Sequence, residues 1–334
     1  MQKPSIFRNW LSISAFSVAA WLYMCLPVSA VTITPLKFDM NLNPGDIKQG
    51  EIKVINETNE RQTYYASVQN FVASGEEGQQ TFLEEKEKLG LVKWMGLEKS
   101  SVTLDPGKSA NFKWAINLPK DAEPGGHYAA MFFSTQPETA QNKAVGVGGR
   151  VGVLFLVNVA GNVKEEAAIE SFQTVIGEDP QTAVPATWTD RLPVGFELRI
   201  RNSGSVHFKP TGVIRISSMF GKSQTVQVNP NDGAVLPDTI RKIRSSWGPR
   251  GLPKGGFFQE LKNEWEGMAF GRYTAKVDAK YGLSNQVLSA ETAFWVLPWR
   301  LGIVSLVILA ILVLLMSGYN KMVIRSAMKK SVKK

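Results

Sequence analysis

Few side chains in this chain could perform covalent or metal chemistry. The sequence has two histidines, His127 and His207, and one cysteine, Cys25. Cys25 lies in an apolar N-terminal segment that we expect to be removed, so thiolate catalysis and Cys/His zinc sites are excluded from the mature chain. The spacings typical of a nucleophile elbow, a zinc protease or a phosphate loop do not occur. Each histidine is therefore interpreted as a hydrogen-bonded structural residue, with a ligand role as the alternative.

The 29 acidic residues could supply the two carboxylates of a glycoside hydrolase. That reaction needs carboxyl groups about 5 to 10 Å apart across a cleft, and sequence spacing does not define such a pair. A membrane-tethered hydrolase is therefore only the third functional hypothesis. Calcium would suit an exported β-protein, but no Asp-x-Asp cluster indicates a loop for it. We predict no cofactor and no metal. Gly146–Gly152 is glycine-rich but is predicted to be a hairpin connection, because it leads into a β-branched run.

The C-terminal end dominates the organisation of the chain. Leu301–Tyr319 contains no charge and would span about 28 Å as a helix, close to the hydrocarbon thickness of a bilayer. We therefore predict a single transmembrane helix over residues 298–319; a buried helix in a soluble core is the alternative. Aromatic residues favour membrane interfaces, and a long cationic side chain at the edge can extend to water. The predicted membrane-interface anchors are Trp295, Trp299, Arg300 and Tyr319.

The two ends of the chain predict the same topology. The tail, residues 320–334, is basic and has no acid, so the positive-inside rule places it in the cytoplasm. Residues 1–30 have a positive start, an apolar centre and small residues at the end, which is typical of a signal peptide cleaved after Ala30. An uncleaved signal anchor and a lipoprotein modified at Cys25 are the alternatives. In each case the bulk of the chain is extracytoplasmic.

Net charge does not indicate a nucleic-acid partner. The whole chain has 38 basic and 29 acidic residues. Nine of the basic residues lie in the signal, at Arg300 or in the tail, which leaves 29 basic against 29 acidic residues in the exported part. A nucleic-acid-binding domain would carry a basic face, so the basic character is assigned to membrane topology.

The exported part has the pattern of an all-β protein. Short runs of alternating apolar and polar residues are separated by Gly, Pro and Asn turns. We predict two tandem immunoglobulin-like β-sandwiches plus one C-terminal transmembrane helix. The first sandwich is predicted over residues 31–160, a linker over 161–167 and the second sandwich over 168–297. The runs at Gly125–Phe133 and Val151–Val159 are apolar on both faces and are predicted to be central strands. The charged cluster Glu84–Lys88 is predicted to be solvated surface.

One long connection, Gly248–Gly267, stands out because loops of this length are uncommon in compact domains. Its apolar residues have near-helical spacing and are accompanied by Arg250, Lys254 and Lys262. We predict a partner-binding loop or a helix on the outer leaflet; a loop packed over its own domain is the alternative. The candidate residues are Trp247, Phe257, Phe258, Leu261 and Trp265. Most of the exported tryptophans, Trp114, Trp188, Trp247, Trp265 and Trp295, are predicted to fill the cores.

Several motifs of the first half resemble a known family. The strand ending in Asn56, the turn Asp105–Gly107 and the strand beginning Pro124–Tyr128 are similar to the N-terminal domain of WxL-interacting proteins. The resemblance covers Val31–Val159 and the order of the segments, and it is weak beyond that. It implies a bacterial surface protein whose domains bind peptidoglycan, partner proteins with a Trp-x-Leu motif, or host ligands. Periplasmic pilus chaperones and major sperm proteins share the early strand pattern but lack such a helix.

The resulting functional expectation is a non-catalytic, membrane-anchored envelope protein. It would bind another envelope protein or a cell-wall polymer through its sandwiches, in adhesion or scaffolding. The alternative is an assembly chaperone that adds a strand to its client by edge pairing.

Overall fold

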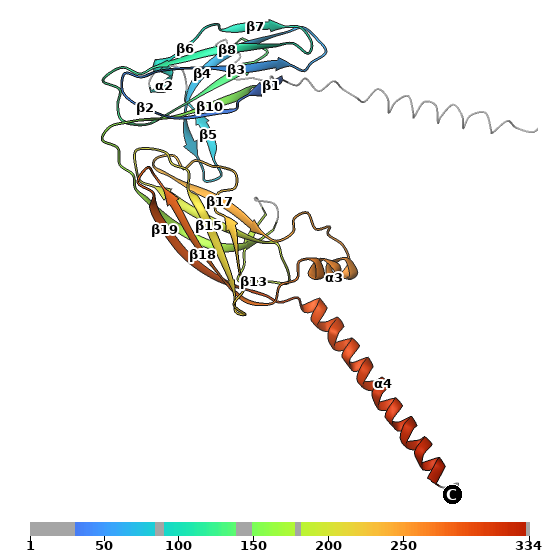
Figure 1. Cartoon of the computed structure of the whole chain (residues 1–334). Helices are drawn as coiled ribbons and strands as arrows, with labels where there is room; N and C mark the ends of the chain where they lie inside the picture. Colours follow the sequence, from blue (N-terminus) through green and yellow to red (C-terminus); the bar gives the residue numbers. More distant parts are fainter. Residues whose placement is uncertain (1–30, 84–89, 138–148, 178–181, 332–334) are drawn as a thin grey trace, which may run out of the picture. The chain divides into compact units, whose positions relative to one another are not determined.

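The structure is a computed structural model that describes residues 31–83, 90–137, 149–177 and 182–331, with side chains up to Arg325. The described chain forms two compact units (Figure 1). The first comprises the chain to Val72 together with Thr81–Asn162, and the second comprises Ala73–Gln80 together with the chain from Val163 onward. The predicted signal peptide with Cys25, the cluster Glu84–Lys88 and part of Gly146–Gly152 lie outside the described residues.

The first unit is a sandwich of two sheets. One sheet has the order β1-β3-β8-β6, and the other has the order β2-β10-β9-β4-β5 with β7 paired to β4. The elements are β1 Val31–Thr34, β2 Lys37–Leu42, β3 Ile47–Asn56, β4 Gln62–Ser74, β5 Gln79–Phe82, α2 Leu91–Trp94, β6 Met95–Leu97, β7 Ser101–Leu104, β8 Ser109–Asn117, β9 Gly125–Ser134 and β10 Val151–Val159.

Apolar side chains from both sheets meet in the first core. In β8, alternate residues Phe112, Trp114 and Ile116 are buried, which is the period of a strand with one face on a core. β9 lies between β10 and β4 and is buried on both faces over much of its length. The prediction that the segments now seen as β9 and β10 are central strands is confirmed.

The alternating run Val31–Phe38 predicts one strand, but the structure divides it between the two sheets. β1 pairs with β3, whereas β2 pairs in parallel with β10. Pro35 separates β1 from β2. Proline has no N–H for a ladder hydrogen bond, so the pairing of β1 ends there and the chain crosses to the other sheet.

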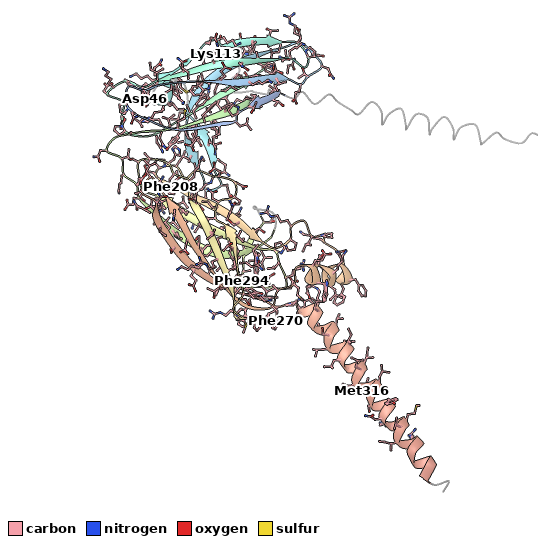
Figure 2. All side chains as sticks on the ribbon, in the orientation of Figure 1. Asp46, Lys113, Phe208, Phe270, Phe294 and Met316 are labelled. Atoms are coloured by element: carbon pink, nitrogen blue, oxygen red, sulfur yellow. The ribbon has the colours of Figure 1, made fainter. Side chains whose placement is uncertain are left out.

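The second unit is also a sandwich of two sheets, with the orders β12-β11-β14-β17 and β13-β19-β18-β15-β16. Its core includes Phe208 and Phe294, which Figure 2 labels inside the sandwich. The elements are β11 Ala167–Ile176, β12 Val184–Pro185, β13 Trp188–Thr189, β14 Val194–Asn202, β15 Thr211–Ser218, β16 Ser223–Gln227, β17 Thr239–Trp247, α3 Phe257–Glu266, β18 Gly271–Tyr281, β19 Gln286–Val296 and α4 Trp299–Ser331. The predicted fold class, all-β with two sandwiches and one long C-terminal apolar helix, is confirmed.

Strand β17 was not predicted from the sequence. Arg241, Lys242 and Arg244 weaken the apolar alternation that marks a strand, yet β17 pairs with β14 along its whole length. It is the last strand of its sheet, and its cations are half-buried, with Lys242 Nζ 3.2 Å from Glu77 Oε1. Arg244 Nη2 lies 2.9 Å from Oε2 of the buried Glu197 on β14, so the cation also neutralises a buried carboxylate.

A buried asparagine closes an equivalent turn in each sandwich. Asn56 ends β3, and its Nδ2 donates to the carbonyl oxygens of Glu60 and Leu104 at 2.8 and 3.0 Å. Its Oδ1 accepts from the N–H of Thr58 and from the hydroxyl of Tyr64, both at 3.0 Å. Burial raises the pKa of the Tyr64 phenol, so this hydroxyl stays a donor.

In the second sandwich, Asn202 ends β14 and makes the same pattern of bonds. Its Nδ2 donates to the carbonyl oxygens of Val206 and Val235 at 2.9 and 3.0 Å, and its Oδ1 accepts the N–H of Gly204 at 2.9 Å. Both asparagines thus bind the backbone two and four residues ahead and one distant carbonyl. The two sandwiches share a structural device, although their sequences show no obvious repeat.

Glu165, at the start of the second unit, is tied to the turn between β18 and β19. Its carboxylate accepts the N–H of Leu283 at 2.7 Å and the hydroxyl of Ser284 at 2.8 Å. Burial opposes ionisation of Glu165, but these hydrogen bonds outweigh it and hold the pKa of the carboxyl below its ordinary value of 4.5. The carboxylate therefore fastens the chain leaving the first unit to the second sandwich.

Candidate membrane-proximal site

Helix α4 is apolar and exposed on all sides. Among the described residues it is the one helix long and apolar enough to cross a membrane, over Trp299–Arg325, and none of its most apolar window is buried within the protein. Met316 projects away from it (Figure 2). A helix buried in a soluble core would have its side chains covered, so this exposure is compatible with a membrane anchor and not with the buried-helix alternative. The helix continues beyond the predicted end at Tyr319, through most of the basic tail.

The start of α4 is held by a buried carboxylate on α3. Glu264 has no exposed surface. One of its oxygens lies 2.8 Å from Arg300 Nη1, and the other accepts the backbone N–H of Leu301 at 2.9 Å. Glu264 therefore satisfies one of the free N–H groups in the first turn of α4 and neutralises the cation beside it.

A second carboxylate completes this arrangement from the turn after β13. Arg300 Nη1 also lies 2.5 Å from Asp190 Oδ2, which in turn is 3.0 Å from Arg191 Nη1. Arg191 Nη2 reaches Glu260 Oε2 on α3 at 2.7 Å. Three segments far apart in the sequence, the β13 turn, α3 and the start of α4, are thus joined by one network of ion pairs, the Arg300 network.

Helix α3 packs its polar face on the protein and turns its apolar face outward. At about 100° per residue, the buried Asn263 and Glu264 and the half-buried Glu260 share one side. Asn263 donates to the carbonyl oxygen of Pro253 at 2.8 Å. The adjoining arc, also about 100° wide, is apolar and consists of Phe257, Phe258, Leu261 and Trp265. Phe258 is 83% and Trp265 66% exposed, whereas Leu261 is half-buried.

The C-terminal end of α3 depends on a glycine. Gly267 follows the helix, its N–H bonds the carbonyl of Asn263, and its own carbonyl accepts the N–H of Leu192 at 3.0 Å. A Cβ at Gly267 would lie 2.4 Å from the carbonyl oxygen of Leu192. Only glycine allows this approach, which holds α3 against the segment that leads into β14.

Of the residues predicted for the Gly248–Gly267 segment, the structure separates one from the rest. Trp247 belongs to the end of β17, where its ring packs against Tyr273 and Phe294 and its Nε1 donates to Gln224 Oε1 at 2.7 Å. It lines a groove on the sandwich with Phe270 and does not share the exposed face of α3. The alternative of a loop packed over its own domain holds for the polar side of α3 only.

The predicted interface anchors also differ among themselves. Trp295, Trp299 and Tyr319 are exposed. Arg300 is not directed to water as expected, because Asp190 and Glu264 bind its guanidinium. Its guanidinium carbon also lies 4.5 Å from the centre of the Trp299 ring. A cation at the edge of an apolar segment is costly unless paired, and here the protein itself supplies the pair.

The prediction that most exported tryptophans fill the cores is wrong for Trp188 and Trp295, whereas Trp265 was set apart as a candidate binding residue. Trp114 is buried and Trp247 is half-buried, but Trp188, Trp265 and Trp295 are exposed. Trp188 is the register partner of Trp295 in the parallel pairing of β13 with β19, so both lie on one face of the sheet. β19 leads directly into α4, which places this pair beside the start of the apolar helix.

Asp190 and Glu264 are the important residues that the sequence did not identify. The available signal was indirect: Arg300 is a lone charge next to an apolar run, and such a charge needs a partner. Glu260 and Glu264 also share one side of the segment at a spacing of one helical turn. Which acids would reach Arg300 depends on long-range packing.

The histidines do not form a site. His127 Nε2 lies 2.8 Å from the carbonyl oxygen of Glu123, and its ring packs edge-on against Trp94, the arrangement expected of a structural histidine. His207 is buried. In the part of the chain that the structure describes, no three His, Cys, Asp or Glu side chains are grouped so that they could hold a metal ion.

The similarity of this chain to known proteins is limited. No protein-family model matches the sequence, and no curated protein matches it. Among solved structures, the class 5 fimbriae chaperone CfaA aligns at 10% identity over 79% of this chain and 99% of its own, with a TM-score of 0.36. The E. coli chaperone DraB aligns at 11% identity over 78% of this chain and 96% of its own, with a TM-score of 0.34.

A third similar structure is the PapD-like domain 7 of human CEP192. It aligns at 13% identity over 41% of this chain and 90% of its own, with a TM-score of 0.29. At such identities and TM-scores, similarity does not establish a shared function. The fold assignment therefore rests on the sheets of this protein.

Proposed function

We propose that this protein is a non-catalytic, single-pass membrane protein of the bacterial envelope. Its C-terminus lies in the cytoplasm, and its two sandwiches bind another envelope protein or a cell-wall polymer outside. The observation that carries the proposal is the exposed apolar helix α4, whose first turn is fixed to the second sandwich by Glu264. The resemblance to WxL-interacting proteins is part of this proposal and supports the choice of wall or surface partners.

The structure of the anchor supports a scaffold more than a flexible tether. Leu297 N–H donates to the carbonyl of Thr189 at 2.9 Å, and two residues later α4 begins. The chain therefore passes from β19 into the helix without a glycine-rich linker, and the Arg300 network holds the junction. A domain held this way keeps one orientation to its membrane, which favours binding of a fixed surface.

Topology is tested with the full chain in cells. One tag follows the predicted signal cleavage site and another follows Lys334. The outer layers of the cells are opened while the cytoplasmic membrane stays intact. Protease added to these cells should remove the first tag and spare the second. Protection of the first tag would overturn the proposed orientation. The matched control replaces Leu309 and Leu312 by Arg, which should release the chain from alkali-washed membranes, because each cation at the centre of a span costs about 3 kcal/mol.

Partner binding is tested with the detergent-solubilised full chain. It should co-sediment with purified cell wall or retain a discrete set of envelope proteins, and the helix variant in which Leu309 and Leu312 are Arg should bind equally. Retention of neither wall polymer nor envelope protein would count against the proposed binding role, whatever the outcome for topology.

The assembly-chaperone hypothesis has one specific structural support. β10 pairs with β9 along its full length, but β2 covers its other side only from Leu154 onward. Among the described residues, Val151–Val153 therefore has one side without a paired strand. An edge of three residues is short for a complementing strand, since strands usually have five or six residues. Replacing Gly152 by Pro would block this edge, and a chaperone acting there should lose its client.

A further inference from the structure

We propose that α3 lies on the outer leaflet, with its apolar face inserted at the boundary between headgroups and acyl chains. This inference rests on the proposed membrane anchor and adds a second contact with the same bilayer. The occupant of the exposed face is thus the lipid around α4, not a soluble partner. Three observations carry the inference.

The first observation is the direction of the amphipathic helix. A helix on a soluble domain ordinarily packs its apolar side inward and exposes its polar side. α3 does the reverse, because Asn263 and Glu264 are buried while Phe257, Phe258 and Trp265 are exposed. The polar side is fully engaged in hydrogen bonds and ion pairs, so the helix is held outward by specific contacts.

The second observation is the position of α3 along the membrane normal. Glu264 accepts the N–H of Leu301, the first residue of the uncharged run in α4. This bond places one end of α3 at the level where the apolar helix leaves the sandwich. If α4 spans the bilayer, that level is the outer interface. The Arg300 network holds α3 at this level relative to the start of α4.

The third observation is the number of exposed apolar side chains at this end of the second sandwich. Trp188 and Trp295 stand together where β13 pairs with the end of β19. Gly271, which begins β18, is the register partner of Val296, so the residues just before it belong to the same end. The exposed aromatic and sulfur side chains here are Phe220, Met268 and Phe270 together with Trp188, Trp295 and Trp299.

The charges beside α3 fit an interfacial helix. Lys262 lies next to the apolar arc and is exposed, and Arg250 and Lys254, which precede the helix, are also exposed. Cationic side chains at the edge of an inserted face can extend to the phosphates of the headgroups. Three acids of this end, Asp190, Glu260 and Glu264, are turned inward and paired, so they do not repel an anionic surface. The exposed Glu266 lies outside the apolar arc of α3 and is paired with Lys262 at 3.6 Å.

The test places an environment-sensitive fluorophore on single cysteines in the full chain, reconstituted in phosphatidylglycerol-containing vesicles on a Cys25→Ser background. The positions are Phe258→Cys on α3, Leu283→Cys at the opposite end of the second sandwich, and Ile311→Cys in α4. Phe258 and Leu283 are 83% and 77% exposed, so neither change disturbs packing. Quenchers carried on the lipid chains and iodide in the water report where each label lies.

We expect the labels at 258 and 311 to be quenched by the lipid-borne quencher and shielded from iodide, and the label at 283 to show the reverse. If position 311 lies in lipid while position 258 responds like position 283, the anchor stands and the docking of α3 is wrong. If position 311 stays in water, the membrane anchor itself fails. A label at 258 that is shielded from both quenchers would show that protein covers this face, which also overturns the proposal.

Discussion

The two sandwiches share a structural device at the end of one strand but differ in where they place tryptophans and acids. Both end a central strand with a buried asparagine, Asn56 or Asn202, that binds the backbone two and four residues ahead. The first packs its described tryptophans, Trp94 and Trp114, in or against the core. The second exposes Trp188, Trp265 and Trp295 near the start of α4, beside the buried acid Glu264.

This difference fits the membrane anchoring that we propose for the second unit. A core of apolar side chains is sufficient for a domain surrounded by water, as in the first sandwich. The second sandwich has an end that continues into the apolar helix α4. There the ordinary distribution is reversed: carboxylates and guanidiniums are turned inward, and aromatic rings are turned outward. Polar groups inside and apolar groups outside are favourable only where the surroundings are not aqueous.

The largest expected effect is on Glu264, a buried acid with no counterpart among the described residues of the first sandwich. Glu264→Ala leaves Arg300 and the Leu301 N–H without their partner and should destabilise the contact between α3 and α4 by about 3 to 5 kcal/mol. Hydrogen exchange followed by mass spectrometry on the full chain in detergent should show faster exchange in Phe257–Glu266 and unchanged exchange in the first sandwich.

The matched control for that variant is Glu266→Ala on the same helix. Glu266 is exposed and lies 3.6 Å from Lys262, one turn away. Exposed pairs of this kind contribute about 0.3 to 0.5 kcal/mol, so exchange should hardly change. Equal effects of the two substitutions would contradict the role assigned to Glu264.

The next largest effect concerns the shared asparagines. Asn56→Ala and Asn202→Ala each leave buried backbone groups unpaired and should cost about 2 to 4 kcal/mol. Asn56 should be the costlier, because its Oδ1 also accepts the Tyr64 hydroxyl. Urea unfolding monitored by peptide-resolved hydrogen exchange should show each loss in its own sandwich. A loss that spreads equally to both would mean that the two units do not unfold independently.

A smaller effect is expected on the pH dependence of the stability of the second sandwich. Glu165 has a folded pKa below its ordinary value of 4.5, so its contribution is fully present above that value and is lost as the pH falls through the folded pKa. Glu165→Gln should therefore lower the stability of the second sandwich by about 1 kcal/mol at pH 7. Urea midpoints measured at pH 7 and in acid should show the difference from the parent shrinking, and a constant difference would exclude this linkage.

The smallest effect is expected on the surface of the first sandwich. Lys113 Nζ lies 4.0 Å from Glu98 Oε2, and both side chains are more than half exposed. Lys113 lies on the outer surface of the sandwich (Figure 2). Lys113→Ala should lower the free energy of unfolding of the first sandwich, measured by urea unfolding, by no more than about 0.5 kcal/mol. A larger loss would show that surface charge stabilises the first sandwich as buried charge does the second.

Local patterns predicted most of the strands because their information lies within each segment. The uninterrupted alternation over Gly271–Tyr281 predicts a strand, and β18 has these bounds. β17 was missed because its Lys242 and Arg244 side chains are paired with acids of other segments, which its own sequence does not show. The split of Val31–Phe38 between two sheets was also missed, since Pro35 marks an interruption but does not say which strand is paired on either side.

In the candidate site, too, some features follow from consecutive residues and others from contacts between distant segments. The sequence by itself determined the long apolar helix, because an uncharged run of bilayer length is a property of consecutive residues. It also determined the amphipathic spacing of Phe257, Phe258, Leu261 and Trp265. Only the tertiary structure decided that this apolar face points outward, that Trp247 belongs to the sandwich, and that Arg300 is paired. The physical reason is that a face becomes inner or outer through contacts between distant segments, and the acids that hold α3, Asp190 and Glu264, meet Arg300 only when the chain is folded.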